Sequence, residues 1–215
     1  MNHPLAAYEE PTLSCTRCPL SATRTQVVFG SGDPNAELMF VGEAPGFHED
    51  QQGVPFVGQA GQLLEKLLNG IGLSRTDVYI ANVLKCRPPG NRDPHPEEIE
   101  ACESHLFRQI ELIRPTLVAT LGNFATKLLS GKPAGITRVH GVPQQVTLGG
   151  NAVTLYPLYH PAAALYTRSM LAVLEEDFAQ IPELLGGSPF VPETQSAVEP
   201  ERERPLEPAM QLGLF

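Results

Sequence analysis

Residues 37–50 read ELMFVGEAPGFHED, and they contain the clearest indication of the fold class. Residues 37–41 form a strand-like run rich in apolar residues, and two glycines and a proline follow within the next five residues. A strand that runs into a tight glycine turn is typical of a parallel α/β sheet, whose ligands bind at the carboxyl ends of the strands. We therefore expect the first core strand and the first functional loop in this segment.

Three more strand-like runs follow, at residues 78–84, 116–121 and 153–158. Helical patterns separate or follow them, after Gly61, after Pro96, and over residues 123–129 and 161–185. The helix after Pro96 opens with a proline and acids, as helix N-termini often do. Strands and helices that alternate in this way predict a three-layer α/β/α fold around a central, mostly parallel four-stranded sheet.

The composition predicts one domain and no membrane anchor. The chain has 215 residues, 42% of them hydrophobic, which is enough for one core. It has no apolar run as long as a membrane helix needs, and its N-terminus lacks the layout of a signal peptide. We expect residues 1–185 to form a soluble, monomeric domain and residues 186–215, rich in Pro and Glu, to be a disordered tail.

The charge limits how the chain can meet nucleic acid. Its formal net charge is −9, which argues against such a partner because phosphate binding draws on Lys and Arg. The tail, with five acids and two bases, accounts for part of this charge, but the body remains acidic. Any contact with DNA must therefore be local and involve few phosphates.

The four cysteines point to one metal site. Cys15 and Cys18 form a C-x-x-C pair, Cys86 ends the second strand-like run, and Cys102 lies in the following helix. Buried thiols or a redox pair are the alternatives, but a redox C-x-x-C normally opens a helix directly after a strand, which this pair does not. Zinc and a [4Fe–4S] cluster both accept four thiolates, and the spacing alone does not separate them.

The loop after the first strand carries acids rather than a phosphate-binding signature. Glu43, Glu49 and Asp50 would repel phosphate, and the lysine and hydroxyl of a G-x-x-x-x-G-K-[ST] loop are absent. Paired carboxylates at the end of a strand suit activation of water or stabilisation of a cationic transition state.

Three more residues converge on the same edge of the predicted sheet: Phe56, Asn82 and His160. Each has an ordinary interpretation, since a Phe is usually core, an Asn in a strand needs a paired amide, and a His before a helix can be a cap. Together, a stacking ring, an amide and an imidazole donor suit an extruded pyrimidine base.

With these motifs the chain resembles the family 4 uracil-DNA glycosylases, the iron–sulfur branch of that superfamily, over about residues 15–185. The resemblance rests on C-x-x-C, GEAPG-x-x-ED, G-x-PFVG-x-AG, N-V-x-K-C-RPPGNR-x-P, a further Cys and HPA. It implies a DNA-repair enzyme that flips uracil out of DNA and hydrolyses the N-glycosidic bond, leaving an abasic site for base excision repair. It also implies a structural [4Fe–4S] cluster on the four cysteines.

The resemblance gives the base-binding residues their roles. Phe56 stacks on the flipped uracil, Asn82 hydrogen-bonds its amide edge, and backbone groups of Gly42, Glu43 and Ala44 complete the pocket.

For the chemistry, it implies that His160 donates to the 2-oxo group and so stabilises the departing uracil anion. Glu43 or Glu49 stabilises the sugar cation and orients water, and the sequence does not decide between them.

Two loops are expected to meet DNA, single- or double-stranded. Arg87 and Arg92 lie in the proline-rich loop after the third cysteine, and Arg138 and His140 lie in a loop that would enter the duplex. The glycosylases compared usually carry Arg at the position of His140. Some relatives trap the sugar cation on a histidine, so a covalent or non-catalytic uracil-DNA-binding protein is one alternative. Another alternative is a nucleic-acid-binding domain that a metal site stabilises and that catalyses no reaction.

The last five residues resemble the Q-L-x-L-F peptide with which bacterial repair proteins engage the sliding clamp. The motif comprises Gln211, Leu212, Leu214 and Phe215, at the end of the predicted tether. An amphipathic chain end is the alternative. Tethering would raise the effective concentration of the domain at replicating DNA. We therefore expect a bacterial cytoplasmic protein that acts at the nucleoid.

Overall fold

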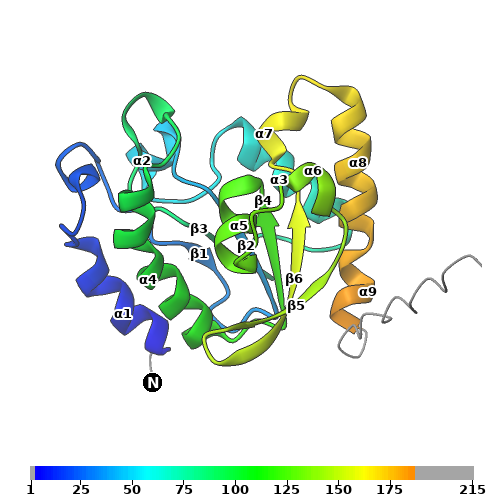
Figure 1. Ribbon diagram of the computed structural model, residues 1–215, viewed down its shortest axis with the longest axis horizontal. Helices are drawn as coiled ribbons and strands as arrows, with labels where there is room; N and C mark the ends of the chain where they lie inside the picture. The colour runs from blue at the N-terminus through cyan, green and yellow to red at the C-terminus, as the bar shows by residue number, and fades with distance from the viewer. Residues whose placement is uncertain (1–2, 187–215) are drawn as a thin grey trace, which may run out of the picture.

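A six-stranded sheet lies at the centre of the computed structural model, which describes residues 3–186 (Figure 1). The strand order is β1-β3-β2-β4-β6-β5. Four strands run parallel: β3 (Tyr79–Asn82), β2 (Leu38–Gly42), β4 (Leu117–Leu121) and β6 (Asn151–Leu158). The edge strands β1 (Ser31–Gly32) and β5 (Gln144–Leu148) pair antiparallel with β3 and β6.

Helices cover both faces of the sheet. One layer contains α1 (Pro4–Leu13), α4 (Pro96–Ile113) and α5 (Asn123–Ser130). The other contains α3 (Gln59–Gly70), α7 (Pro161–Ala164), α8 (Arg168–Ala179) and α9 (Ile181–Gly186). The short elements are α2 (Phe47–Gln52), α6 (Ile136–Val139) and the 3-10 turns η1 (Pro19–Ala22) and η2 (Pro89–Asn91). The predicted three-layer α/β/α class is confirmed.

Alternating side chains of the central strands build the two halves of the core. In β2, Met39 and Val41 join the cluster under α4 and α5, whereas Leu38 and Phe40 join the cluster under α3 and α8. All five residues of β2 are buried. This burial on both faces is why the parallel strands read as continuous apolar runs rather than as alternating patterns.

The sheet has six strands rather than the predicted four, because the two edge strands lack that apolar signature. The four predicted strands are the parallel core, whereas β1 has two residues and β5 alternates half-buried with exposed positions. The single helix expected over 161–185 is three helices, and Pro182 lies just inside α9, where its missing N–H breaks continuity with α8. Helix α1 was not predicted, since Pro4 and Pro11 interrupt its pattern.

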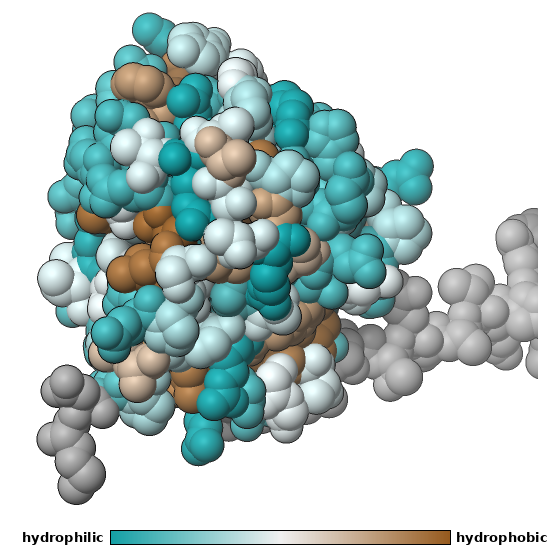
Figure 2. Space-filling view, turned by 90° about the vertical axis from the view of Figure 1, so that its left-hand side faces the viewer, coloured by the Kyte–Doolittle hydropathy of each residue, from teal (hydrophilic) through white to brown (hydrophobic). Residues whose placement is uncertain are grey.

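The carboxyl ends of the parallel strands lie together at one end of the molecule, next to α2, α6 and α7 (Figure 1). No helix among residues 3–186 is long and apolar enough to cross a membrane. The face that carries α1, α2 and α4 is mostly polar, with apolar side chains in several small areas among the polar ones (Figure 2). The clamp-like motif of Gln211, Leu212, Leu214 and Phe215 lies outside the described residues, as does the rest of segment 187–215.

Candidate functional site

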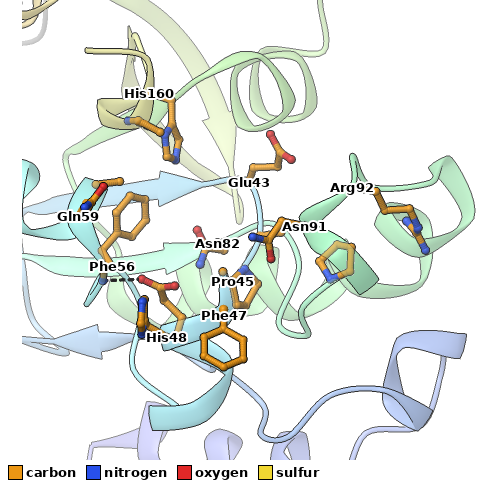
Figure 3. A pocket seen from close by; sticks show the side chains of 17 residues that line it. Glu43, Pro45, Phe47, His48, Phe56, Gln59, Asn82, Asn91, Arg92 and His160 are labelled. Atoms are coloured by element: carbon orange, nitrogen blue, oxygen red, sulfur yellow. Dashed lines mark hydrogen bonds between the residues drawn. The ribbon is translucent and has the colours of Figure 1, made fainter. Parts of the chain in front are cut away.

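A cleft of about 570 Å³ opens where β2 and β3 end (Figure 3). Its walls come from the loop after β2, from α2, from the start of α3, from η2 and from the start of α7. Five of the residues predicted to bind the base line this cleft, together with the candidate catalytic carboxylate Glu49: Glu43, Ala44, Phe56, Asn82 and His160. The sequence therefore identified side chains that are far apart in the chain and adjacent in space.

Asn82 is the deepest polar residue of the cleft. It is the last residue of β3 and only 2% exposed. Its Oδ1 atom is buried and has no hydrogen-bond partner among residues 3–186. Because an unpaired buried acceptor costs free energy, such an atom in a cleft indicates a ligand that donates to it.

Gly42 lies directly beneath this amide. A Cβ atom at this position would lie 2.6 Å from Cζ of Phe56 and would overlap Oδ1 of Asn82. Only glycine therefore lets the Phe56 ring and the Asn82 amide approach β2 so closely. This close approach explains the glycine at the end of the strand, where the sequence alone indicated only a turn.

The backbone of Phe56 is strained and firmly held. Its φ angle is +56°, a left-handed conformation that few non-glycine residues adopt. The Arg75 guanidinium donates to the carbonyl oxygens of Phe56, at 2.8 Å, and Pro55, at 2.6 Å. A Cβ atom at Gly61 would lie 1.7 Å from the Phe56 carbonyl oxygen, so α3 packs directly against this loop. Strain that neighbouring groups maintain is typical of binding sites.

The two candidate carboxylates have different surroundings. Glu49 accepts two hydrogen bonds through Oε1, from the backbone N–H groups of Val57 and Gly58, both at 2.9 Å. These contacts hold the loop that follows Phe56 (Figure 3). Glu43 is half-buried, and burial, with the nearby charge of Asp93, raises the pKa of its carboxyl to about 7. Glu43 is therefore the carboxyl whose charge changes near neutral pH.

His160 is placed to donate into the cleft. Its Nδ1 atom accepts a hydrogen bond of 3.1 Å from the N–H of Ala162, at the start of α7. The proton of the neutral ring is therefore on Nε2. Burial lowers the pKa of His160 to about 4, against the opposing effect of Glu49, so the ring is neutral at pH 7. The rings of His160 and Phe56 stack with centroids 5.6 Å apart.

The four predicted metal ligands come together at a second, smaller pocket. Cys15, Cys18, Cys86 and Cys102 line one small pocket between the N-terminal segment, the loop after β3 and α4, and none forms a disulfide.

Polar neighbours surround these thiols. The backbone N–H of Lys85 donates to Sγ of Cys102, and Arg24 Nη1 donates to Sγ of Cys86, each at 3.3 Å. His105 Nε2 lies 3.3 Å from Sγ of Cys15.

Comparison with known proteins identifies the family. The family model described as the uracil DNA glycosylase superfamily matches residues 29–183. The chain belongs to this superfamily. It is 49% identical to the Type-4 uracil-DNA glycosylase of Archaeoglobus fulgidus, over 81% of this chain and 89% of that protein. It is 48% identical to the Type-4 uracil-DNA glycosylase of Thermotoga maritima, over 74% of this chain and 82% of that protein.

A more distant relative is the Type-5 uracil-DNA glycosylase of Pyrobaculum aerophilum. It is 36% identical over 61% of this chain and 63% of that protein. The similarity to Type-4 proteins is both stronger and more extensive, which confirms the resemblance identified from the motifs.

The two arginines predicted to contact DNA after the third cysteine of this glycosylase differ in whether a carboxylate compensates their charge. Arg92 lines the cleft but is paired with Glu98, with Nη2 and Oε1 2.6 Å apart. Arg87 lies with its guanidinium carbon 5.1 Å from the centroid of the Phe47 ring. The charge of Arg92 is thus compensated within the protein.

The second predicted DNA-contacting pair lies beside β6. Arg138 is exposed on α6, and His140 follows it as the C-cap residue. Nδ1 of His140 lies 3.0 Å from Oδ2 of Asp177 on α8, and its ring lies 4.5 Å from that of Tyr159. The orientation of His140 is therefore fixed by the domain.

Two residues of the glycosylase site were missed by sequence reasoning. Lys85 is 2% exposed, and its Nζ donates to the carbonyl oxygen of Asn82, at 2.8 Å, and to Oε1 of Gln109, at 2.6 Å. A lysine within a buried apolar run was the available signal, because a buried ammonium requires partners. Arg75 lies in an ordinary polar stretch, and nothing in the sequence indicates its contacts with the Phe56 loop.

Proposed function

We propose that this chain excises uracil from DNA by hydrolysing the N-glycosidic bond, which releases uracil and leaves an abasic site. The observation that carries this function is the unpaired, buried Oδ1 of Asn82 in a cleft that also presents a neutral imidazole donor. The similarity to Type-4 uracil-DNA glycosylases over most of the chain supports the same activity.

Asn82 selects the base by its hydrogen-bond pattern. Its Oδ1 accepts the N3–H of uracil, and its amide nitrogen donates to the 4-oxo group. Cytosine has an unprotonated N3 and an amino group at these positions, so it would leave the buried oxygen unpaired. Selection against a base that leaves buried polar groups unpaired is strong. Phe56 stacks on the flipped ring, and Gly42 lets Phe56 and Asn82 lie close enough to β2 to form the pocket.

His160 stabilises the leaving group. As the C1′–N1 bond breaks, negative charge develops on the uracil ring and its 2-oxo atom. The Nε2–H of a neutral His160 donates to that atom without a compensating proton transfer. A preorganised donor of this kind contributes more in a water-poor site than in bulk water.

Glu43 is the better candidate for the carboxylate that orients water and stabilises the sugar cation. Oε1 of Glu49 already accepts two backbone N–H groups, so this residue positions the Phe56 loop. The half-buried Glu43 lines the cleft, and its pKa of about 7 makes the ionised form available at and above neutral pH. An ionised carboxylate near the developing sugar cation lowers the barrier electrostatically.

The cysteine pocket fits an iron–sulfur cluster better than a zinc ion. Tetrahedral zinc holds its sulfurs at about 2.3 Å, and hence about 3.8 Å from one another. Among residues 3–186, no three His, Cys, Asp or Glu side chains are arranged to hold one metal ion, although all four thiols line one pocket. The similarity to Type-4 uracil-DNA glycosylases, whose motifs the chain shares, favours a cluster with several metal atoms. A bound [4Fe–4S] cluster would tie the N-terminal segment to the loop after β3 and to α4.

Uracil release from oligonucleotides tests the proposed function. Purified protein is incubated with single- and double-stranded oligonucleotides that contain one uracil, and free uracil, alkali-labile sites and SDS-resistant adducts are scored. Multiple turnovers with free uracil and no adduct support the proposal. A stoichiometric adduct that His140→Ala abolishes would contradict it, as would binding without release.

The C-terminal motif suggests a protein partner for the enzyme. We propose that Gln211, Leu212, Leu214 and Phe215 engage the bacterial sliding clamp, which would concentrate the enzyme at replicating DNA. Deletion of residues 211–215 should abolish clamp pull-down and leave excision from short oligonucleotides unchanged. Equal pull-down by the truncated protein would contradict this role.

A further inference from the structure

Phe47 is an exposed aromatic residue in the same cleft as the base-reading amide. It is the first residue of α2, lines the cleft and is 52% exposed. Figure 3 shows its ring at the end of the cleft away from His160, with Asn82 between them. A Phe that served only the core would be buried, so the part of this ring that Arg87 and His48 do not cover is available to a ligand.

Arg87 gives this ring a cationic neighbour. Its guanidinium carbon lies 5.1 Å from the Phe47 ring centroid, and its Nε donates to Oδ1 of Asn91 at 2.6 Å. Within residues 3–186 no carboxylate forms a salt bridge with Arg87, whereas Arg92, in the same loop, is paired with Glu98. Arg87 is therefore oriented by neutral partners and keeps its charge for an anion.

An exposed aromatic ring beside an uncompensated cation is the combination with which proteins hold unpaired bases and their phosphates. The ring stacks on a base of any identity, and the cation meets the backbone. The cleft also has far more room than one pyrimidine ring fills. The flipped uracil at Asn82 would leave space for part of a neighbouring nucleotide at Phe47.

We propose that Phe47 and Arg87 form a second subsite, which binds the unpaired base next to the flipped uracil in single-stranded DNA. Phe47 stacks on that base, and Arg87 binds a phosphate beside it. This subsite rests on the proposed uracil excision. Single-stranded DNA is the substrate that would occupy the whole cleft, because in a duplex the neighbouring base stays stacked on its own strand.

The test compares variants on substrates with and without the neighbouring bases. Uracil release is measured on a single-stranded oligonucleotide, on the same strand with abasic analogues at both neighbours of the uracil, and on the duplex. The variants are Phe47→Ala, the conservative Phe47→Tyr, and Val54→Ala. The last is a matched control, because Val54 is an exposed apolar residue that does not line the cleft. Thermal melting confirms that each variant is folded.

Phe47→Ala should lower kcat/KM on the ordinary single strand by roughly 5- to 150-fold, mainly through KM, as loss of one stacked base would. The same change should leave release from the strand with abasic neighbours unchanged. Phe47→Tyr and Val54→Ala should behave like the unaltered protein. Arg87→Gln should reduce the slope of log KM against log salt concentration by about 0.7, the contribution of one phosphate on a single strand.

Equal losses on the ordinary strand and on the strand with abasic neighbours would overturn the subsite, because the effect would not pass through a stacked base. An equal loss on the duplex would overturn the choice of an unpaired base. If Phe47→Ala lowered kcat/KM on none of the substrates, the proposed subsite would be overturned as well. Failure of the unaltered protein to release uracil from every substrate would instead refute the proposed function.

Discussion

Gly42→Ala tests the base pocket at its most crowded point. The added Cβ atom would lie 2.6 Å from Cζ and 2.8 Å from Cε2 of Phe56, whereas ordinary contacts of a Cβ begin at 3.4 Å, so the ring must move by about 0.8 Å. Arg75, Glu49 and the close packing of α3 hold the Phe56 backbone in place. The ring or the Asn82 amide must therefore leave its position.

A displacement of about 1 Å in a catalytic site can reduce the rate about 100-fold. We expect Gly42→Ala to lower single-turnover uracil release by about that factor. Overpacking should also lower the free energy of unfolding by about 1–3 kcal/mol, which leaves a folded protein. The assay is rapid-quench measurement of uracil release at saturating enzyme, with thermal melting and iron content measured on the same preparations.

Gly70→Ala is the matched control, because it adds the same methyl group at the end of α3, where nothing lies within 4 Å. It should leave the rate unchanged and stabilise the protein slightly, since Ala is favoured over Gly in a helix. If Gly42→Ala released uracil as fast as Gly70→Ala does, the account of a pocket closed beneath Asn82 would be refuted.

Three further predictions concern the groups around the base. His160→Gln should lower kcat by about 100- to 1,000-fold, as loss of one preorganised donor does, and an unchanged kcat in rapid-quench assays would remove its role. The carboxyl of Glu43, with its raised pKa, is protonated below about pH 7 and ionised above it, so kcat should fall as the pH drops through 7. Glu43→Gln should remove this inflection, and an identical pH profile in that variant would contradict the assignment. Glu49→Ala should remove the acceptor of the Val57 and Gly58 N–H groups, loosen the loop after Phe56 and lower the free energy of unfolding by about 1–3 kcal/mol, measured by chemical denaturation. The inflection near pH 7 should remain in this variant, and its loss would contradict the assignment to Glu43.

The parallel core was predictable because strands that are buried on both faces consist mostly of apolar residues. Residues 38–41 are all apolar and four of the six residues 116–121 are, and β2 and β4 lie within one residue of the predicted limits. Edge strand β5 carries polar residues on its exposed side, so a local pattern does not distinguish it from a loop. The same holds for α1, whose prolines argue against a helix although packing against α4 stabilises one.

The candidate site also has features that the sequence predicts and features that it does not. Asn82 and His160 could be identified because a polar residue inside or just after a buried strand needs a reason. The different environments of Glu43 and Glu49 could not be identified from the sequence. The environment of Glu49 is set by the backbone N–H groups of residues 57 and 58, and that of Glu43 is set by burial. Contacts of this kind arise only when the chain has folded.

A crystal structure of the protein with free uracil tests whether Asn82, Phe56 and His160 hold the base in the cleft. We expect one uracil in the cleft, stacked on Phe56, with its N3–H within hydrogen-bonding distance of Oδ1 of Asn82 and its 2-oxo group at Nε2 of His160. Uracil bound elsewhere, or bound in the cleft with Oδ1 of Asn82 still unpaired, would contradict the account.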